Sequence, residues 1–412
     1  MSEAKIETDP SEVGLDAERL ARVDEHFRRY VDDGRLPGWT VAVARKGRIA
    51  HLSHYGVLDL EDRRPVGPDS RWRIYSMTKP ITSVAALMLW EQGALELTDP
   101  VSRYIPAFAD QRVYRGGSAL NPGVDAAAGP IRIWHLLTHT AGLTYGFHHA
   151  HPVDEMYRGA GYEFGGPRGV DLAGACETWA GLPLLFEPGT EWNYSVATDV
   201  LGRVVEVASG TTLDRFFAER ILGPLGMDET GFRVDADDPR LATLYAVRPG
   251  GGGLVRNAAL GDAITRDSEY LSGGGGLAST TGDYHRFAQM LARGGELDGV
   301  RLLGPRTLAH ATRNHLPGGA DLDTFGRPIF AESAFTGVGF GLGFSVVVDG
   351  PATHQLASEG TVAWGGLAST AFWVDPVEDL TVLFLTQVMP SSAYPLRSQL
   401  QTLVYQAIVD PV

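Results

Sequence analysis

The spacing of apolar side chains in the first sixty residues predicts one helix followed by a β-hairpin. Between residues 16 and 33, apolar side chains recur every three or four positions, which is typical of an amphipathic helix. Two runs rich in apolar and β-branched residues follow at 39–44 and 49–52. They are separated by Lys46-Gly47, a short turn-forming sequence that predicts an antiparallel hairpin.

The end of the chain has a similar pattern. Strand-like runs occupy residues 344–348, 369–374 and 380–385, and the segment 375–379 between the last two predicts a hairpin turn. Apolar positions at helical spacing then predict a closing helix over 396–409. Strands are therefore expected at both ends of the chain.

The middle of the chain is patterned differently, with helical periodicity separated by loops rich in glycine and proline. Helices are expected at 81–92, 133–137, 199–208, 213–221 and 283–293. Strands at both termini around a helical middle predict an α+β fold: an antiparallel sheet flanked by helices, with an inserted, mainly helical domain. We expect residues 1–75 and 300–412 to form the sheet domain and residues 76–299 the helical domain. The active site is expected in the cleft between them.

Charge and composition narrow the function classes. The 412 residues carry a formal net charge of -15, which argues against binding to polyanionic nucleic acids or membranes. No apolar run reaches the ~20 residues of a membrane span, and the acidic start of the chain lacks the features of a secretory signal. We expect a cytoplasmic protein, a monomer or small homo-oligomer. The single cysteine, Cys176, is expected to be a buried structural residue.

The candidate nucleophile is Ser76, in Ser76-Met77-Thr78-Lys79. A serine hydroxyl needs a neighbouring base, and residues three apart on a helix share a face, so the amine of Lys79 can reach Ser76. A second Ser-x-x-Lys occurs at residues 2–5, but no apolar helix follows it. Lysine occurs only at Lys5, Lys46 and Lys79, while arginine supplies the rest of 35 basic residues. Arginine cannot lose its proton to serve as a base, so a lysine at the start of an apolar helix indicates a catalytic role for its amine.

Further motifs in the same order along the chain resemble those of class C β-lactamase-like serine hydrolases, which are related to penicillin-binding proteins. The similar segments are 73–79, 136–143, 187–190 with 193–195, 223–227, 273–277 and 363–366. Within the last, Trp364-Gly365-Gly366 is similar to the third motif of family VIII carboxylesterases. The resemblance implies a class C β-lactamase-like fold.

The resemblance also implies roles for individual residues. Ser76 corresponds to the acylated serine, Lys79 to its activating lysine, and Tyr194 to the tyrosine that acts as general base and then acid. The backbone N–H groups of Ser76 and Leu367 correspond to the oxyanion hole. Trp364, Gly365 and Gly366 are the implied substrate-binding segment.

Two departures from the β-lactamase pattern favour an ester as the small-molecule substrate. Trp364 stands where a cationic lysine would pair with a substrate carboxylate, and Val196 stands where an asparagine usually contacts the amide side chain. We also expect Tyr145 and Phe147 to offer apolar surface for an acyl chain. The predicted activity is hydrolysis of short-chain carboxylic esters, with a possible weak β-lactamase side activity.

Several alternatives stay open or are disfavoured. Acyl transfer to an alcohol or amine uses the same acyl-enzyme, and a β-lactamase or D-peptidase type of amide hydrolysis is related chemistry. A catalytically inactive binding protein is disfavoured by the intact Ser76, Lys79 and Tyr194. The chain has no Gly-x-Ser-x-Gly elbow of the α/β-hydrolases. Histidines cluster at positions 135, 139, 148, 149 and 151, but no zinc-binding motif accompanies them, so we expect neither a metal nor a cofactor.

Overall fold

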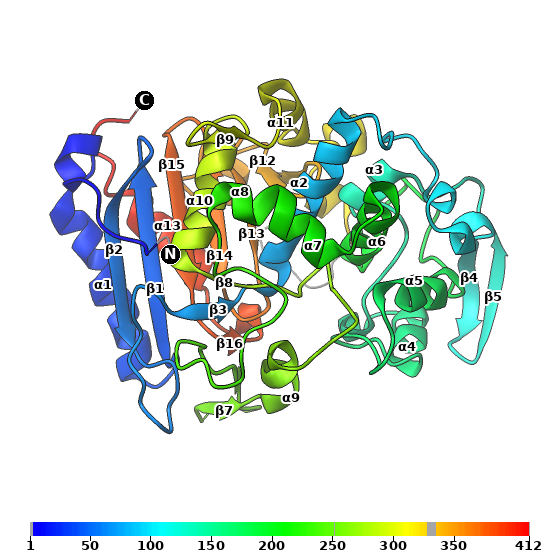
Figure 1. Cartoon of the computed structure of the whole chain (residues 1–412), viewed down its shortest axis with the longest axis horizontal. Helices are drawn as coiled ribbons and strands as arrows, with labels where there is room; N and C mark the ends of the chain where they lie inside the picture. Colours follow the sequence, from blue (N-terminus) through cyan, green and yellow to red (C-terminus); the bar gives the residue numbers. More distant parts are fainter. Residues whose placement is uncertain (1–2, 251, 328–334, 412) are drawn as a thin grey trace.

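The centre of the molecule is an antiparallel sheet that joins the two ends of the chain. The computed structural model describes residues 3–250, 252–327 and 335–411. Among these residues, seven strands lie side by side in the order β11-β12-β13-β14-β15-β1-β2. Their bounds are β1 Gly38–Arg45, β2 Arg48–Gly56, β11 Val338–Phe340, β12 Ser345–Val347, β13 Val362–Gly365, β14 Ala371–Asp375 and β15 Leu380–Leu385. Strand β1 pairs with β15, with Val43 opposite Val382, so the first and last thirds of the chain share one sheet (Figure 1). The predicted α+β fold is confirmed.

Helices cover both faces of this sheet. Helix α1 (Ala17–Asp32) and helix α13 (Leu396–Tyr405) pack on one face, and α10 (Thr281–Ala292) packs against β14 and β15 on the other. Helix α1 begins where the Asp16 side chain accepts a hydrogen bond from the backbone N–H of Arg19, a standard N-cap. Alternate residues of β1 point to opposite faces: Val41 and Val43 enter the core under α1, while Ala42 enters the core on the other side.

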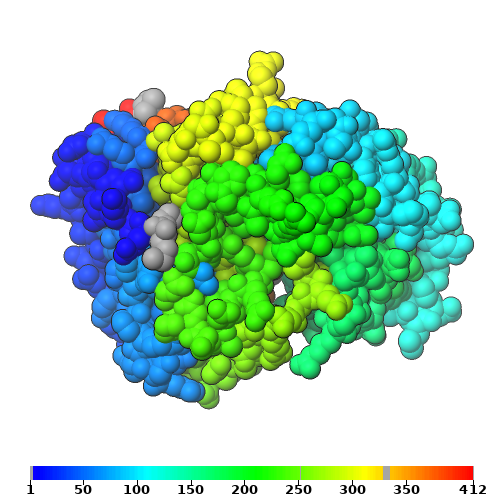
Figure 2. Space-filling view, in the orientation of Figure 1, coloured from blue at the N-terminus to red at the C-terminus, as the bar shows by residue number. Residues whose placement is uncertain are grey.

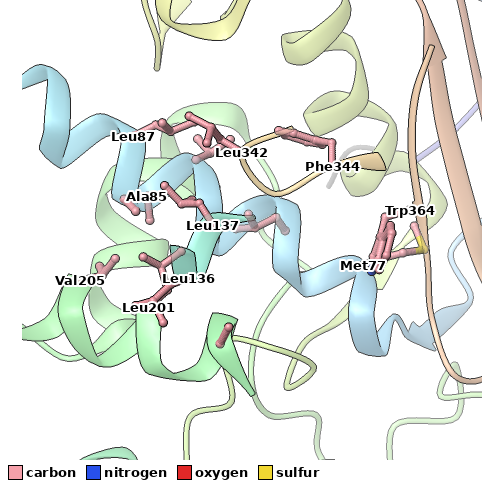
Figure 3. Packing of buried hydrophobic residues seen from close by; sticks show 14 of the residues in the cluster. Met77, Ala85, Leu87, Leu136, Leu137, Leu201, Val205, Leu342, Phe344 and Trp364 are labelled. Carbon is pink, nitrogen blue, oxygen red and sulfur yellow. The ribbon is translucent and has the colours of Figure 1, made fainter. Parts of the chain in front are cut away.

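Helix α2 (Thr78–Glu91) is the centre of the helical region. Its residues from Thr78 to Leu89 are all buried, the polar side chains of its first two turns included. It packs against α6 (Ala197–Ser209), and α3 (Ile133–Leu137) also contacts α6. Figure 3 shows side chains of these three helices meeting in one apolar layer, with Met77 and Trp364 at its end nearest the sheet.

Shorter elements complete the fold. The remaining helices are α4 (Pro152–Gly159), α5 (Leu172–Ala180), α7 (Leu213–Phe217), α8 (Gly223–Leu225), α9 (Ala258–Gly261), α11 (Pro305–Ala311) and α12 (Leu322–Phe325). The remaining strands are β3 (Arg71–Arg73), β4 (Arg112–Ser118), β5 (Asn121–Ala126), β6 (Tyr245–Val247), β7 (Leu254–Arg256), β8 (Ala278–Thr280), β9 (Glu296–Leu297), β10 (Val300–Arg301) and β16 (Val388–Met389). None of the helices in the described ranges is both long and apolar enough to cross a membrane.

Three predicted helix boundaries are wrong by more than two residues: α2 begins at Thr78 rather than at 81, and two other helices end early. The closing helix ends at Tyr405 rather than at 409, because Ile408 forms a β-bridge with Leu15 and the N–H of Val409 bonds to the carbonyl of Gly14. The predicted helix 213–221 is regular only to Phe217 and continues as a π-helical turn over 218–222. The division into domains at residues 76 and 299 remains a prediction.

The surface is hollowed next to the helical region. Figure 2 shows an opening between the yellow-green segment around residues 260–275 and the teal-green segment around residues 160–175. The first of these segments is tied to α6, since the hydroxyls of Tyr270 and Ser272 hydrogen-bond to Asp199 on that helix.

Candidate active site

Ser76 lies in a tight turn immediately before α2. Residues Tyr75–Met77 form a single 3-10 turn, and α2 begins at Thr78. Tyr75 has a φ angle of 42°, in the left-handed region that a bulky side chain rarely adopts. The turn is held from behind by Tyr284, whose hydroxyl donates to the carbonyl of Met77 at 2.8 Å. Strained backbone of this kind is common next to catalytic groups and persists only where packing fixes it.

Lys79 reaches Ser76 across one turn. Its Nζ lies 3.3 Å from the Ser76 Oγ and donates a hydrogen bond to the carbonyl of Gly274 at 2.7 Å. The side chain is buried, with Lys79 only 2% exposed. A glycine carbonyl from the loop before β8 therefore fixes the position of the amine beside the serine.

Tyr194 approaches Ser76 from the loop before α6. Its hydroxyl donates to the Ser76 Oγ at 2.6 Å, and its ring lies 4.5 Å from the Lys79 Nζ. Tyr194 is 2% exposed, so water is largely excluded from the three groups. The Ser76 oxygen thus has two proton-transfer partners within hydrogen-bond distance.

The segment Trp364 to Gly366 borders the site on the sheet side. Strand β13 lies inside the sheet rather than at its outer edge, but its described pairing with β12 covers only Val362 and Ala363. The backbone edge of the residues that follow, from Trp364 onward, is therefore not paired with β12. The Trp364 ring lies 5.5 Å from the Tyr194 ring, between centroids, and is part of the core that surrounds α2.

Close backbone approach explains the glycines of this segment. A Cβ on Gly366 would lie 2.4 Å from the carbonyl oxygen of Ile74 and 2.3 Å from Thr370 Oγ1, so no larger residue fits. This contact holds the end of β13 against the turn that carries Ser76, and it places Leu367 beside that turn. The N–H of Leu367 has no hydrogen-bond acceptor among the described residues, as required of an oxyanion-hole donor in a free enzyme.

Gly365 faces the opposite side of the sheet from Trp364. A Cβ there would overlap the guanidinium of Arg397, on α13, at 2.1 Å. Arg397 donates to the carbonyls of Gly366 at 3.2 Å and Thr370 at 3.0 Å, and so braces the turn after β13. Sequence reasoning missed Arg397, because nothing in the sequence around α13 indicates contact with the third motif.

Tyr145 and Phe147 form an aromatic wall on the other side of Tyr194. The rings of Tyr145 and Phe147 are stacked with centroids 4.6 Å apart, and Phe147 stacks in turn on Phe164 at 5.3 Å. Tyr145 also contacts the Tyr194 ring edge-on at 5.2 Å and lies 5.3 Å from the Lys79 Nζ. Tyr145 therefore lies close to Tyr194 and Lys79, and Phe147 stacks behind it. Their role in an acyl pocket remains a prediction.

Asp199 is a buried residue of the candidate site that sequence reasoning missed. It lies on α6, is 2% exposed, and accepts hydrogen bonds from the Tyr270 hydroxyl (3.1 Å), the Ser272 hydroxyl (2.6 Å) and the Gly274 N–H (3.1 Å). The same Gly274 binds Lys79 through its carbonyl. Asp199 therefore fixes the loop that positions the lysine. One signal in the sequence could have indicated it: a carboxylate stands among the apolar positions of a predicted helix, five residues after Tyr194. Acidic side chains are rarely buried without a partner, so such a residue predicts a specific contact.

His139 packs directly behind Tyr194. Its ring centroid lies 5.1 Å from that of Tyr194, and its Nδ1 is 3.2 Å from the Ser195 hydroxyl. Burial lowers the pKa of His139 well below its usual range, and the positive charge of Lys79 adds to this effect. The imidazole is therefore neutral and holds the loop that carries Tyr194.

The other histidines of the cluster have separate partners. Within the described ranges, no group of three or more histidine, cysteine or carboxylate side chains is arranged to hold a metal ion. The pairs are His135 Nδ1 with the N–H of Arg132 (3.0 Å), His149 with Glu163 (3.0 Å), and His151 with the N–H of Val153 (3.2 Å). Cys176 is buried and unbridged, as expected.

Known proteins resemble this chain over most of its length. The beta-lactamase family model matches residues 23–406. Esterase EstB from Burkholderia gladioli is 34% identical over 420 residues, covering 96% of this chain and 98% of EstB. Protein Rv1367c from Mycobacterium tuberculosis is 35% identical over 369 residues, covering 88% of this chain and 89% of its own length. The solved structure of EstCE1, described as a hydrolase with promiscuous acyltransferase activity, superposes with a TM-score of 0.80 at 29% identity, covering 94% of this chain and 99% of EstCE1.

Proposed function

Because this chain belongs to the beta-lactamase family, we propose that it is a serine carboxylesterase that forms an acyl-enzyme on Ser76. The observation that carries the proposal is the position of one serine oxygen between two proton-transfer groups. The Ser76 Oγ lies 2.6 Å from the Tyr194 hydroxyl and 3.3 Å from the Lys79 amine. A serine held in this way is an activated nucleophile.

The proposed reaction has two steps through one intermediate. Ser76 attacks the ester carbonyl while its proton passes to the Lys79–Tyr194 pair, and the carbonyl oxygen takes up negative charge beside the N–H groups of Ser76 and Leu367. The pair returns the proton to the leaving alcohol through Tyr194, which leaves the acyl group on Ser76. A water molecule then attacks the acyl-enzyme while the pair accepts one of its protons. The pair returns that proton to the Ser76 Oγ as the bond between Oγ and the acyl carbon breaks, which releases the carboxylic acid and restores the serine hydroxyl.

The surroundings of the site support a neutral substrate. Trp364, Tyr145 and Phe147 present aromatic surface on both sides of Tyr194. Arg397, a cation next to the third motif, lies on the far face of the sheet and is engaged by backbone carbonyls. A β-lactam or peptide carboxylate would lose its hydration without gaining a cationic partner at Trp364, which disfavours binding. Weak β-lactam hydrolysis is compatible with the shared acylation step. The likeness to EstB adds support for an esterase.

A second candidate function is acyl transfer from the same intermediate. The specific support is the likeness to EstCE1, a hydrolase described as having promiscuous acyltransferase activity. Transfer differs from hydrolysis only in whether an alcohol or amine replaces water in the second step. Adding methanol or butanol to the assay separates the two, because transfer produces a new ester in place of part of the acid.

The test of the proposal uses p-nitrophenyl esters of graded acyl length beside a chromogenic cephalosporin. We expect turnover of the short-chain esters to exceed cephalosporin turnover, and Ser76→Ala to abolish both. Cephalosporin turnover without ester turnover would overturn the esterase assignment and favour amide hydrolysis. Absence of any hydrolysis, with no acyl-enzyme formed, would favour a binding protein.

A further inference from the structure

A chain of hydrogen bonds behind the aromatic wall fixes the protonation of His148. Asp154, at the start of α4, is buried, and its carboxylate accepts the Thr144 hydroxyl at 2.8 Å and the N–H groups of Ala150 and His151, both at 3.0 Å. The Thr144 Oγ1 lies 3.2 Å from the Nδ1 of His148. The chain therefore runs from the carboxylate through the hydroxyl to the imidazole.

The direction of each bond follows from the number of protons available. A threonine hydroxyl has one proton, and Thr144 donates it to a carboxylate that can only accept. The bond to His148 must then be donated by the imidazole, so Nδ1 carries the proton. In a neutral imidazole this leaves Nε2 with a free lone pair, as a hydrogen-bond acceptor.

The imidazole is kept neutral by its position. Burial lowers the pKa of His148 to about 4, against the opposing charge of Asp154 and with a smaller contribution from Lys79. The ring thus lies within electrostatic range of both the carboxylate on one side and the catalytic lysine on the other. At neutral pH the Nε2 acceptor is therefore not occupied by a proton.

The His148 ring is also part of the wall that borders the reactive groups. Its centroid lies 5.9 Å from that of Tyr145, 5.0 Å from Phe147 and 6.4 Å from Tyr194. The Nε2 atom is shielded from solvent and has no hydrogen-bond partner among the described residues. An unpartnered polar atom in such a position is costly, and a ligand that supplies the missing donor removes the cost.

We propose that the His148 Nε2 accepts a hydrogen bond from a hydroxyl group of the substrate, so that the enzyme selects hydroxylated esters over their alkyl isosteres. This inference rests on the proposed esterase function and names the substrate class within it. His148 is then a substrate-binding residue, and Thr144 and Asp154 are positioning residues that act through it. The rest of the wall, Tyr145 and Phe147, contacts the apolar part of the same substrate.

The experiment compares two pairs of esters in which a hydroxyl replaces a methyl group. The first pair is 2-hydroxyethyl butanoate and propyl butanoate, which places the hydroxyl on the alcohol side. The second is racemic methyl 3-hydroxybutanoate and methyl 3-methylbutanoate, which places it on the acyl side. Initial rates in a pH-stat at pH 7.5 give kcat/KM for each ester, and the hydroxyl-to-methyl ratio of each pair is the readout.

The wild-type protein is expected to prefer the hydroxylated member of at least one pair by about tenfold, the size of one buried hydrogen bond. His148→Phe keeps the ring packing but removes the acceptor, so the hydroxyl-to-methyl ratio of kcat/KM should fall to about one, whatever the change in the absolute rates. Thr144→Val removes the hydroxyl that keeps the imidazole proton on Nδ1. It should therefore lower the same hydroxyl-to-methyl ratio, although the imidazole remains. His149→Phe, at the exposed neighbour paired with Glu163, is the matched control and should leave the ratio unchanged.

Each outcome decides the inference. A wild-type ratio near one in both pairs, or a preference that survives in His148→Phe or persists undiminished in Thr144→Val, would overturn it while leaving the esterase proposal intact. Failure of the wild-type protein to hydrolyse any of the four esters would instead contradict the esterase proposal. A serine-directed phosphonate identifies that second case, since it would then leave Ser76 unlabelled.

Discussion

Replacement of Asp199 by asparagine tests whether a buried carboxylate positions the catalytic lysine. The Asp199 carboxylate accepts three hydrogen bonds, and Gly274 links it to the Lys79 amine. An asparagine side chain at this position would have nearly the same shape and could still accept, but without charge. Hydrogen bonds to charged groups contribute about 1.5–3 kcal/mol and neutral ones about 0.5–1.5, so the loss is about 1 kcal/mol per bond and about 3 kcal/mol in all.

The effect on catalysis follows from the same contacts. If the Gly274 carbonyl shifts, the Lys79 amine loses its 2.7 Å partner and its fixed distance from Ser76. A misplacement of about 1 Å in a catalytic group can cost about 100-fold in rate, so Asp199→Asn is expected to lower kcat between about 10- and 100-fold. KM should change little, because Lys79 acts in the chemical step.

The assay is steady-state hydrolysis of p-nitrophenyl butanoate, with urea unfolding of the same preparations. Asp375→Asn is the matched control, because Asp375 is also fully buried and accepts from the Tyr405 hydroxyl (2.6 Å) and the Val377 N–H (2.9 Å) at the β14–β15 turn. It should lose stability but keep its kcat. An Asp199→Asn enzyme with wild-type kcat, or an equal loss in Asp375→Asn, would refute the positioning role.

Three further predictions concern the base, the third motif and pH. Lys79→Arg should lower kcat as severely as Lys79→Ala, since the charge is kept but the base is lost; a clearly more active arginine variant, in the same ester assay, would argue against a base role. Gly366→Ala should abolish most activity and lower the urea midpoint, because its Cβ would overlap Ile74 and Thr370, whereas Gly159→Ala, with nothing within 4 Å of its Cβ, should be neutral by both measurements. The unfolding free energy should fall as pH drops from about 6.5 to 4, because burial lowers the pKa of His148 to about 4, so the unfolded chain binds a proton there that the native state does not; a higher urea midpoint at pH 5 than at pH 7 would contradict this.

The sheet was predictable from sequence where apolar pattern and turn chemistry agree. The runs that became β1 and β15 are short and apolar, and the Lys46-Gly47 turn marks the hairpin from β1 to β2, so local pattern predicted these strands. The hairpin of β4 and β5 was not predicted, because most of its residues are exposed and carry no alternation of apolar and polar side chains. The end of α13 depended on pairing with Leu15, a contact between opposite ends of the chain that local pattern does not contain.

The residues of the candidate site likewise divide into those that local sequence pattern predicts and those that depend on contacts between distant segments. Ser76 and Lys79 could be paired from a spacing of three residues, because the 3-10 turn that carries Ser76 leads directly into α2 and keeps the two side chains on the same side. Tyr194 and Trp364 came from resemblance, since no local pattern relates residues so distant in the chain. Asp199 and Arg397 were missed because each acts through backbone groups of distant loops, contacts that side-chain motifs do not encode.

The most direct test of the central claim is the site of covalent acylation. The wild-type protein is incubated with a p-nitrophenyl phosphonate, its intact mass is measured, and the modified peptide is sequenced by tandem mass spectrometry. We predict one adduct per chain, on Ser76, with none in Ser76→Ala and slower labelling in Tyr194→Phe. Labelling that persists in Ser76→Ala, or an adduct on another residue of the wild-type protein, would contradict the assignment of Ser76 as the nucleophile.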